Sequence, residues 1–127
     1  MILLLDTHVF LWWDSDHAAL SADTKAQIAE AANRVLVSAG SIWEIAIKRR
    51  TGKLSFDGSP AAAIAANGFE ALPILPLDTE QASGLDWAHA DLFDRLLVAQ
   101  ARRLAATLVT ADASLRDYGK VPLLWAG

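Results

Sequence analysis

Four acidic residues stand where apolar runs end or where a helical pattern begins: Asp6, Glu44, Asp94 and Asp112. The first follows the run 2–5, the second comes shortly after the run 35–37, the third opens a helix, and the fourth follows the run 108–110. In open α/β sheets, ligands bind beyond the carboxyl ends of the strands, so acids supplied there by separate elements can converge. Clusters of carboxylate oxygens bind Mg²⁺ or Mn²⁺, and these ions support phosphoryl chemistry.

Each acid also has an ordinary structural explanation. Asp6 and Asp112 can cap the helix or turn that follows them. Glu44 can pair with Lys48 four residues later, which is worth about 0.2 to 0.5 kcal/mol. Asp94 suits the first turn of a helix, where the helix dipole favours a negative charge. The joint pattern is different, because burying several carboxylates together without a cation is costly, and it favours a metal site.

The composition predicts a single globular domain over residues 1–127. The chain has 127 residues, of which 54% are hydrophobic and 20% are charged. A chain of this length can bury about two-thirds of the surface that it exposes when unfolded. It contains no cysteine, which excludes disulfides, thiolate zinc sites and a cysteine nucleophile. A metal ion must therefore be bound by carboxylates or by histidines.

The charge gives no general attraction to nucleic acid, because the formal net charge is −4. Binding of RNA would require a local basic patch that contacts the phosphates of the backbone. The candidate residues for such contacts are Lys48, Arg49, Arg50 and Arg95. The alternative is that these side chains are solvated and complement the dipole at the end of a helix.

Nothing in the sequence predicts a membrane protein. The opening run 2–5 reaches Asp6 without the basic region or the length of a signal peptide. No apolar run approaches the roughly 18 to 20 residues that span a bilayer. We therefore expect a cytoplasmic protein with no membrane partner.

Short apolar runs alternate with helical patterns along the chain, which predicts an α/β fold with a parallel sheet. The expected strands are 1–5, 35–37, 74–75, 107–110 and 121–124. The expected helices are 22–32, one that is capped by Ser38 or Ser41, 61–69, 79–87 and 94–106.

Four segments carry a resemblance to a known family: Leu4–Trp13, Ser41–Lys48, His89–Ala101 and Leu108–Asp112. In this order they resemble a PIN-domain protein of the VapC toxin type, and the resemblance covers essentially the whole chain. It implies a three-layer α/β/α sandwich with a central, mostly parallel sheet. It also implies an endoribonuclease that uses Mg²⁺, or Mn²⁺ in its place, acts as the toxin of a type II toxin–antitoxin system, forms a homodimer and is blocked by a cognate antitoxin.

The resemblance also implies roles for the acids. Asp6, Glu44, Asp94 and Asp112 match the catalytic acidic quartet. We expect Asp6, Asp94 and Asp112 to hold the metal ion, and Glu44 to orient or deprotonate the attacking water. In-line attack on the phosphodiester would leave 5′-phosphate and 3′-hydroxyl ends.

Several neighbouring residues are candidates for supporting roles. The hydroxyls of Thr7 and Thr110 can bond the adjacent carboxylates or a water. Asp91 is expected to cap a helix or to serve as an outer ligand. His8 and His89 are expected to be surface or capping histidines, because a site of hard oxygens for Mg²⁺ does not require imidazole.

Other functions fit the same acids. A metal-dependent phosphatase or a DNA nuclease of similar architecture would use the same cluster, and competition between substrates would separate these enzymes. A non-catalytic interaction domain predicts that the purified protein cleaves nothing. A phosphoacceptor receiver domain would need a lysine at the end of its last strand, whereas Lys120 precedes the last apolar run.

Overall fold

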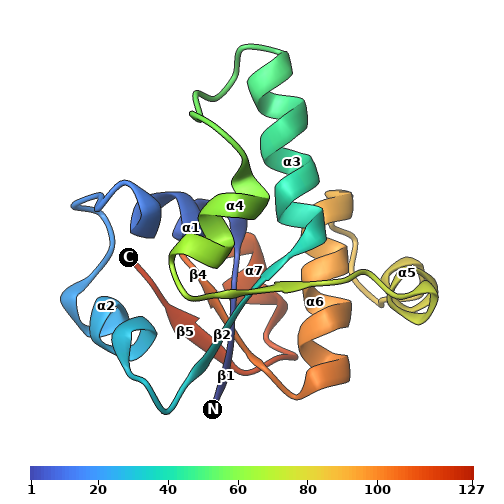
Figure 1. Ribbon diagram of the computed structural model, residues 1–127. Helices are drawn as coiled ribbons and strands as arrows, with labels where there is room; N and C mark the ends of the chain where they lie inside the picture. The colour runs from blue at the N-terminus through green and yellow to red at the C-terminus, as the bar shows by residue number, and fades with distance from the viewer.

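The centre of the molecule is a sheet of five parallel strands, seen in the computed structural model of residues 1–127 (Figure 1). The strands are β1 (Ile2–Leu5), β2 (Arg34–Ser38), β3 (Glu70–Leu72), β4 (Thr107–Thr110) and β5 (Leu123–Trp125). Their order across the sheet is β3-β2-β1-β4-β5, and every neighbouring pair is parallel. The expected parallel sheet is therefore confirmed.

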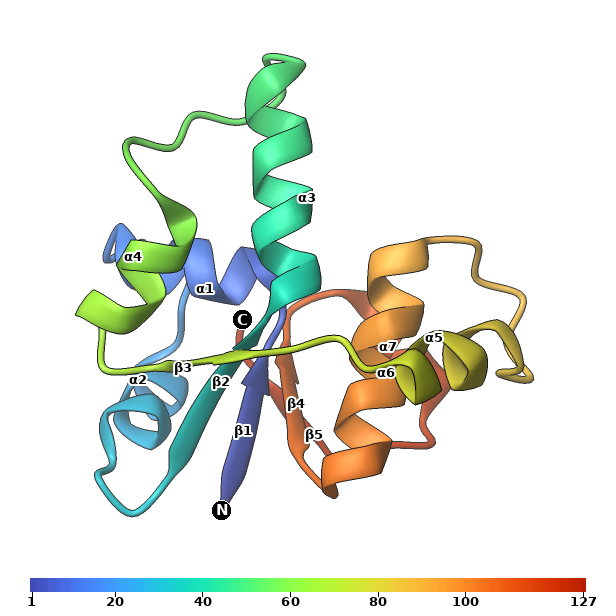
Figure 2. The ribbon, with the colours of Figure 1, turned by 45° about the vertical axis from the view of Figure 1, so that its right-hand side comes forward.

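Helices cover both faces of this sheet, which confirms the three-layer α/β/α sandwich. The helices are α1 (Thr7–Asp14), α2 (Ala22–Ala29), α3 (Ala39–Arg50), α4 (Pro60–Ala66), α5 (Pro76–Ser83), α6 (Leu92–Leu104) and α7 (Ala113–Tyr118). Figure 2 shows α1, α2 and α4 on one side of the sheet, and α5, α6 and α7 on the other. None of the helices combines the length and the apolar character needed to cross a membrane.

The continuous apolar run of β1 reflects burial on both faces. Leu3 and Leu5 belong to the core beneath α1, α2 and α4, together with Phe10. Leu4 belongs to the second core, where it packs with Leu97 of α6. Successive side chains of a strand point to opposite faces, so a central strand covered on both sides is apolar at every position.

The register of the sheet aligns the ends of three strands. Leu5 of β1 pairs with Val37 of β2 and with Val109 of β4. The residues that follow, including Asp6, therefore meet at the carboxyl edge of the sheet. Figure 2 shows α3 rising from this edge, and α6 begins on the same side. Ser38 caps α3 by accepting a hydrogen bond from the Gly40 N–H at 3.0 Å.

The edge of the sheet differs from the expectation. The strand expected at 74–75 is wrong, because the paired strand is β3 and it ends before Pro73. Proline has no N–H for the ladder, and Pro76 instead begins α5, three residues before the expected start of that helix. The last strand also lies later than expected, at Leu123–Trp125. These short elements carry little periodicity of their own.

Candidate active site

Asp6 lies where β1 turns into α1. Its Oδ1 accepts a hydrogen bond from the Val9 N–H at 2.7 Å and so caps α1, while the Thr110 hydroxyl donates to its Oδ2. Burial raises the pKa of Asp6, the bonds from Thr110 and Val9 oppose that shift, and the charge of Asp112 adds to it. The chain therefore places a buried carboxylate here that resists ionisation.

Thr110 connects Asp6 to the fourth acid. Its hydroxyl oxygen accepts a hydrogen bond from the Asp112 N–H at 3.0 Å, while its proton goes to Asp6. Asp112 is exposed and caps α7, because its Oδ1 accepts a hydrogen bond from the Ser114 N–H at 2.8 Å. The sequence thus fixes the ends of β1 and β4 to each other through one side chain.

Glu44 reaches the same edge from α3 and is buried. Its Oε1 accepts a hydrogen bond from the Thr7 hydroxyl at 2.6 Å, and its Oε2 lies 2.7 Å from the Lys48 Nζ. Thr7 also lies 2.9 Å from the Ser41 hydroxyl. Thr7 therefore bonds Glu44 and not the adjacent Asp6, and it holds α1 against α3.

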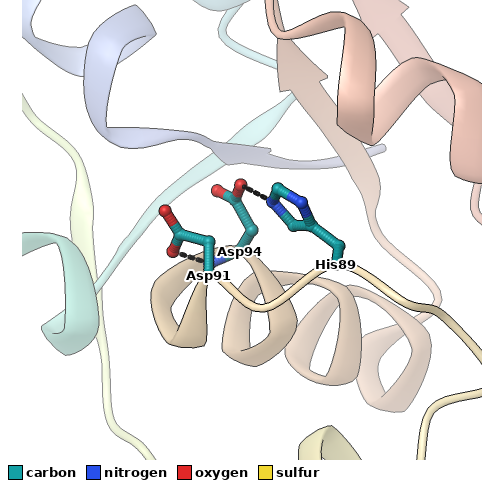
Figure 3. Close-up of side chains that lie close together, drawn as sticks. All are labelled: His89, Asp91 and Asp94. Carbon is teal, nitrogen blue, oxygen red and sulfur yellow. Dashed lines mark hydrogen bonds and ion pairs between the residues drawn. The ribbon is translucent and has the colours of Figure 1, made fainter.

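Asp94 lies in the first turn of α6 (Figure 3). Asp91 caps this helix by accepting hydrogen bonds from the N–H groups of Phe93 and Asp94, at 2.9 and 3.1 Å. Burial raises the pKa of Asp94 to about 6; the hydrogen bond from His89 lowers the pKa, and the charges of Asp91 and Asp112 raise it. Asp94 is thus a second carboxylate whose ionisation is opposed by burial.

His89 is the residue at this site that the sequence interpretation misjudged. Its Nε2 lies 2.7 Å from Oδ2 of Asp94 (Figure 3), so the expectation of a surface or capping histidine is wrong. Its ring stacks on Trp87, with centroids 4.5 Å apart. Ligand atoms of His89, Asp91 and Asp94 all lie within 4.8 Å of one another. In the sequence, the signal for this contact was that His89 stands five residues before Asp94 in the same motif.

The donor set fits a divalent cation of the Mg²⁺ type. Asp6, Asp94 and Asp112 come from three separate segments, and the charge of Asp112 raises the pKa of both other acids. Burial and mutual repulsion oppose the ionised forms, and a cation bound among these oxygens would remove both costs. The imidazole of His89 is already directed at one of these carboxylates.

A family model describes most of this sequence: the PIN domain model matches residues 3–121. The chain belongs to the PIN domain family. No curated protein matches the sequence.

Solved structures share the fold of this PIN domain at low sequence identity. VapBC2 from Rickettsia felis, bound to a promoter DNA fragment, has 16% identity and a TM-score of 0.65, covering 98% of each chain. A toxin–antitoxin complex from Klebsiella pneumoniae has 16% identity and a TM-score of 0.66, covering 97% of this chain and 96% of the other. Mycobacterium tuberculosis VapC20, described as a sarcin-ricin loop cleaving toxin, has 15% identity and a TM-score of 0.58, covering 92% and 95%.

In this PIN domain, Arg95 has a structural role that differs from the expected contact with RNA. Its guanidinium donates hydrogen bonds of 2.6 to 3.3 Å to backbone carbonyls of the segment before α6. The carbonyls belong to Ala82, Ser83, Leu85, Trp87 and His89. These bonds engage its donors and fix the loop that carries His89, so we do not assign Arg95 to the RNA backbone.

The basic cluster at the end of α3 is also partly engaged. Lys48 pairs with Glu44, and Arg49 donates to the carbonyls of Phe56 and Gly58 at 3.1 and 2.7 Å. Arg50 is exposed and forms no ion pair. Arg50 is therefore the member of the predicted set whose guanidinium makes neither an ion pair nor a hydrogen bond, so its donors remain available for a phosphate.

Proposed function

We propose that this PIN domain is the toxin of a type II toxin–antitoxin pair and that it is a divalent-metal-dependent endoribonuclease. The observation that carries the proposal is that Asp6 and Asp112 follow the adjacent strands β1 and β4 and are both hydrogen-bonded to Thr110. Asp94 lies in the first turn of α6, and the charge of Asp112 raises its pKa. The shared fold with a toxin–antitoxin complex supports it, as does the shared fold with VapC20, which is described as a sarcin-ricin loop cleaving toxin. The cytoplasmic location expected from the sequence stays a prediction.

The acids take distinct roles in this proposal. Asp6, Asp94 and Asp112 would hold Mg²⁺, or Mn²⁺ in its place. A bound divalent cation supplies charge neutralisation at the phosphate and makes a water easier to deprotonate. Glu44 would orient that water or accept its proton, while Thr7 and Lys48 keep its carboxylate in one orientation. Water attacking in line would release a 5′-phosphate and a 3′-hydroxyl, so no side-chain nucleophile is needed.

We also propose that the protein pairs with itself through an apolar surface on α3 and α6. Trp43 is 58% exposed and Leu92 is 71% exposed. Trp43 packs edge-on against Phe93, with ring centroids 5.5 Å apart. Tryptophan in an exposed apolar patch is typical of a protein–protein interface. A cognate antitoxin is the second expected partner, as in the complexes that share this fold.

The decisive experiment is cleavage of a pool of structured RNAs by the purified, antitoxin-free protein with Mg²⁺, Mn²⁺ or EDTA. Asp94→Asn should abolish cleavage. Asp23→Asn, the same change at an exposed position on α2, should retain it. We expect metal-dependent cutting and 5′-phosphate ends.

Three other outcomes would contradict the proposal. Products that end in a 2′,3′-cyclic phosphate would refute the attack by water. Preferential hydrolysis of DNA or of phosphate monoesters would favour the other enzyme classes. A well-folded dimer that cleaves nothing would favour a non-catalytic interaction domain.

A further inference from the structure

A cavity of about 650 Å³ opens beside the acidic site, between α1 and the segment 53–57 that follows α3. Figure 2 shows this segment descending from the far end of α3 toward α4, above α1. Two of the lining residues, Thr7 and Lys48, are the hydrogen-bond partners of Glu44. We infer that this cavity binds one unpaired nucleotide of the RNA substrate, next to the phosphodiester that is cut; the inference rests on the proposed ribonuclease function.

The cavity has aromatic walls that suit a base. Trp12 and His17 both line it, and their rings are stacked with centroids 5.7 Å apart and an interplanar angle of 19°. Phe56 adds a further ring on the opposite segment. Stacking on an aromatic side chain tightens binding by about 5- to 150-fold per base, and it tolerates any sequence because every base has a π face.

The position of His17 is fixed by the backbone. The backbone N–H of His17 donates to the Trp12 carbonyl at 2.8 Å, and the ring Nδ1 accepts a hydrogen bond from the Ala19 N–H at 3.0 Å. Because Nδ1 is an acceptor, the neutral ring carries its proton on Nε2. The cavity therefore presents a held ring and an N–H donor, so little ordering is needed when a base enters.

The charges around the cavity suit a whole nucleotide better than a free anion. Lys53 is exposed and forms no ion pair, and it can contact a phosphate. Asp14 and Asp57 also line the cavity, and neither forms an ion pair. A carboxylate repels an isolated phosphate, but it accepts hydrogen bonds from a base amino group or from a ribose hydroxyl.

The place of the cavity explains why it would take a nucleotide next to the cleavage point. Glu44 lies between Thr7 and Lys48, at 2.6 and 2.7 Å from their polar atoms, so the cavity wall is continuous with the acidic site. A nucleotide held there places an adjoining phosphate toward the acids. The base must be unstacked to enter, which selects single-stranded loops over duplex RNA.

The test is the affinity of a dye-labelled, single-stranded hexaribonucleotide for the Asp94→Asn protein with Mg²⁺, measured by fluorescence anisotropy. We expect His17→Ala to weaken binding about 5- to 20-fold, and Lys53→Ala about 2- to 5-fold at low salt. Both residues are exposed, so both variants should fold. Arg34→Ala is the matched control, because it removes one positive charge at the start of β2, at the other end of the sheet.

The outcomes separate the cavity from the proposed function. Loss of affinity in the two cavity variants and not in Arg34→Ala supports the inference. Unchanged affinity in His17→Ala and Lys53→Ala, while the wild-type protein still cleaves RNA, overturns the inference and leaves the function standing. If these variants keep their RNA affinity but bind the antitoxin more weakly, the inference is also overturned and the cavity is assigned to the antitoxin. A protein that neither binds nor cleaves RNA removes both proposals.

Discussion

Asp94→Asn should stabilise the metal-free protein at neutral pH, although it removes a residue of the proposed site. Burial raises the pKa of Asp94 to about 6, so the folded protein binds this proton more tightly than the unfolded chain does. The stability that this proton contributes is fully present below the pKa that Asp94 has in the unfolded chain, and it is lost as the pH rises through about 6. At pH 7.5 the wild-type protein must keep an ionised, partly buried carboxylate, whereas asparagine carries no charge.

The size of the effect follows from the shift. A pKa raised from an ordinary 3.8 to about 6 corresponds to at most about 3 kcal/mol. The side chain is still 17% exposed, and asparagine is a weaker partner for His89 than a carboxylate, so we expect about 1 to 2 kcal/mol. For a domain of this length that is a rise in Tm of about 3 to 8 °C.

Thermal unfolding in EDTA at pH 7.5 and at pH 4.5 measures this effect, with Asp23→Asn as the control. The gain should appear at pH 7.5 and shrink at pH 4.5, where the folded wild type carries Asp94 protonated. Saturating Mg²⁺ should stabilise the wild type and leave Asp94→Asn nearly unchanged, because only a protein that binds the ion gains stability from it. A variant that is less stable than the wild type at pH 7.5 in EDTA, or equally shifted at both pH values, would refute the reasoning.

Four further changes test other parts of the structure. Arg103→Ala should lower the free energy of unfolding, measured with urea, by about 3 to 5 kcal/mol. The change leaves the fully buried Asp78 without the guanidinium that lies 2.6 Å away. A loss below about 1 kcal/mol would contradict this account. Thr110→Val removes the hydrogen bond to the buried carboxylate of Asp6. It should weaken Mn²⁺ binding, measured by calorimetry, about 10- to 100-fold. Unchanged affinity would show that the hydroxyl does not position Asp6. Arg95→Ala should speed hydrogen exchange in the loop before α6, which its guanidinium holds, and unaltered exchange there would mean that the loop is rigid by itself. Trp43→Glu should convert the proposed dimer to a monomer in sedimentation velocity, and a dimer that persists would place the interface elsewhere.

The sequence indicated the central strands and the position of the acids for a physical reason. A strand such as β1 that is buried on both faces must be apolar at every position, and the carboxyl ends of parallel strands meet at one edge. Asp6 and Asp112 therefore could be placed together from their positions after β1 and β4 alone. Helix α6 was equally visible, because its apolar positions recur with helical spacing along 13 residues.

The edges of the fold were not predictable in the same way. Strand β3 has three residues and pairs only with β2, so it carries no continuous apolar run. The prolines at 73 and 76 marked an interruption, but the sequence did not show on which side of it the strand would lie. The pairing of residues 70–72 with β2 decided that the strand lies before the prolines.

The sequence alone determined which acids could form a site and to which family the chain belongs, because both depend on residue types in a fixed order along the chain. Only the tertiary structure decided how the supporting side chains are used. His89 faces Asp94 because stacking on Trp87 and the bonds of Arg95 to its loop hold it there. The cavity beside Glu44 exists because a segment without regular structure returns over α1. Such contacts join residues through irregular backbone, which leaves no periodic pattern in the sequence.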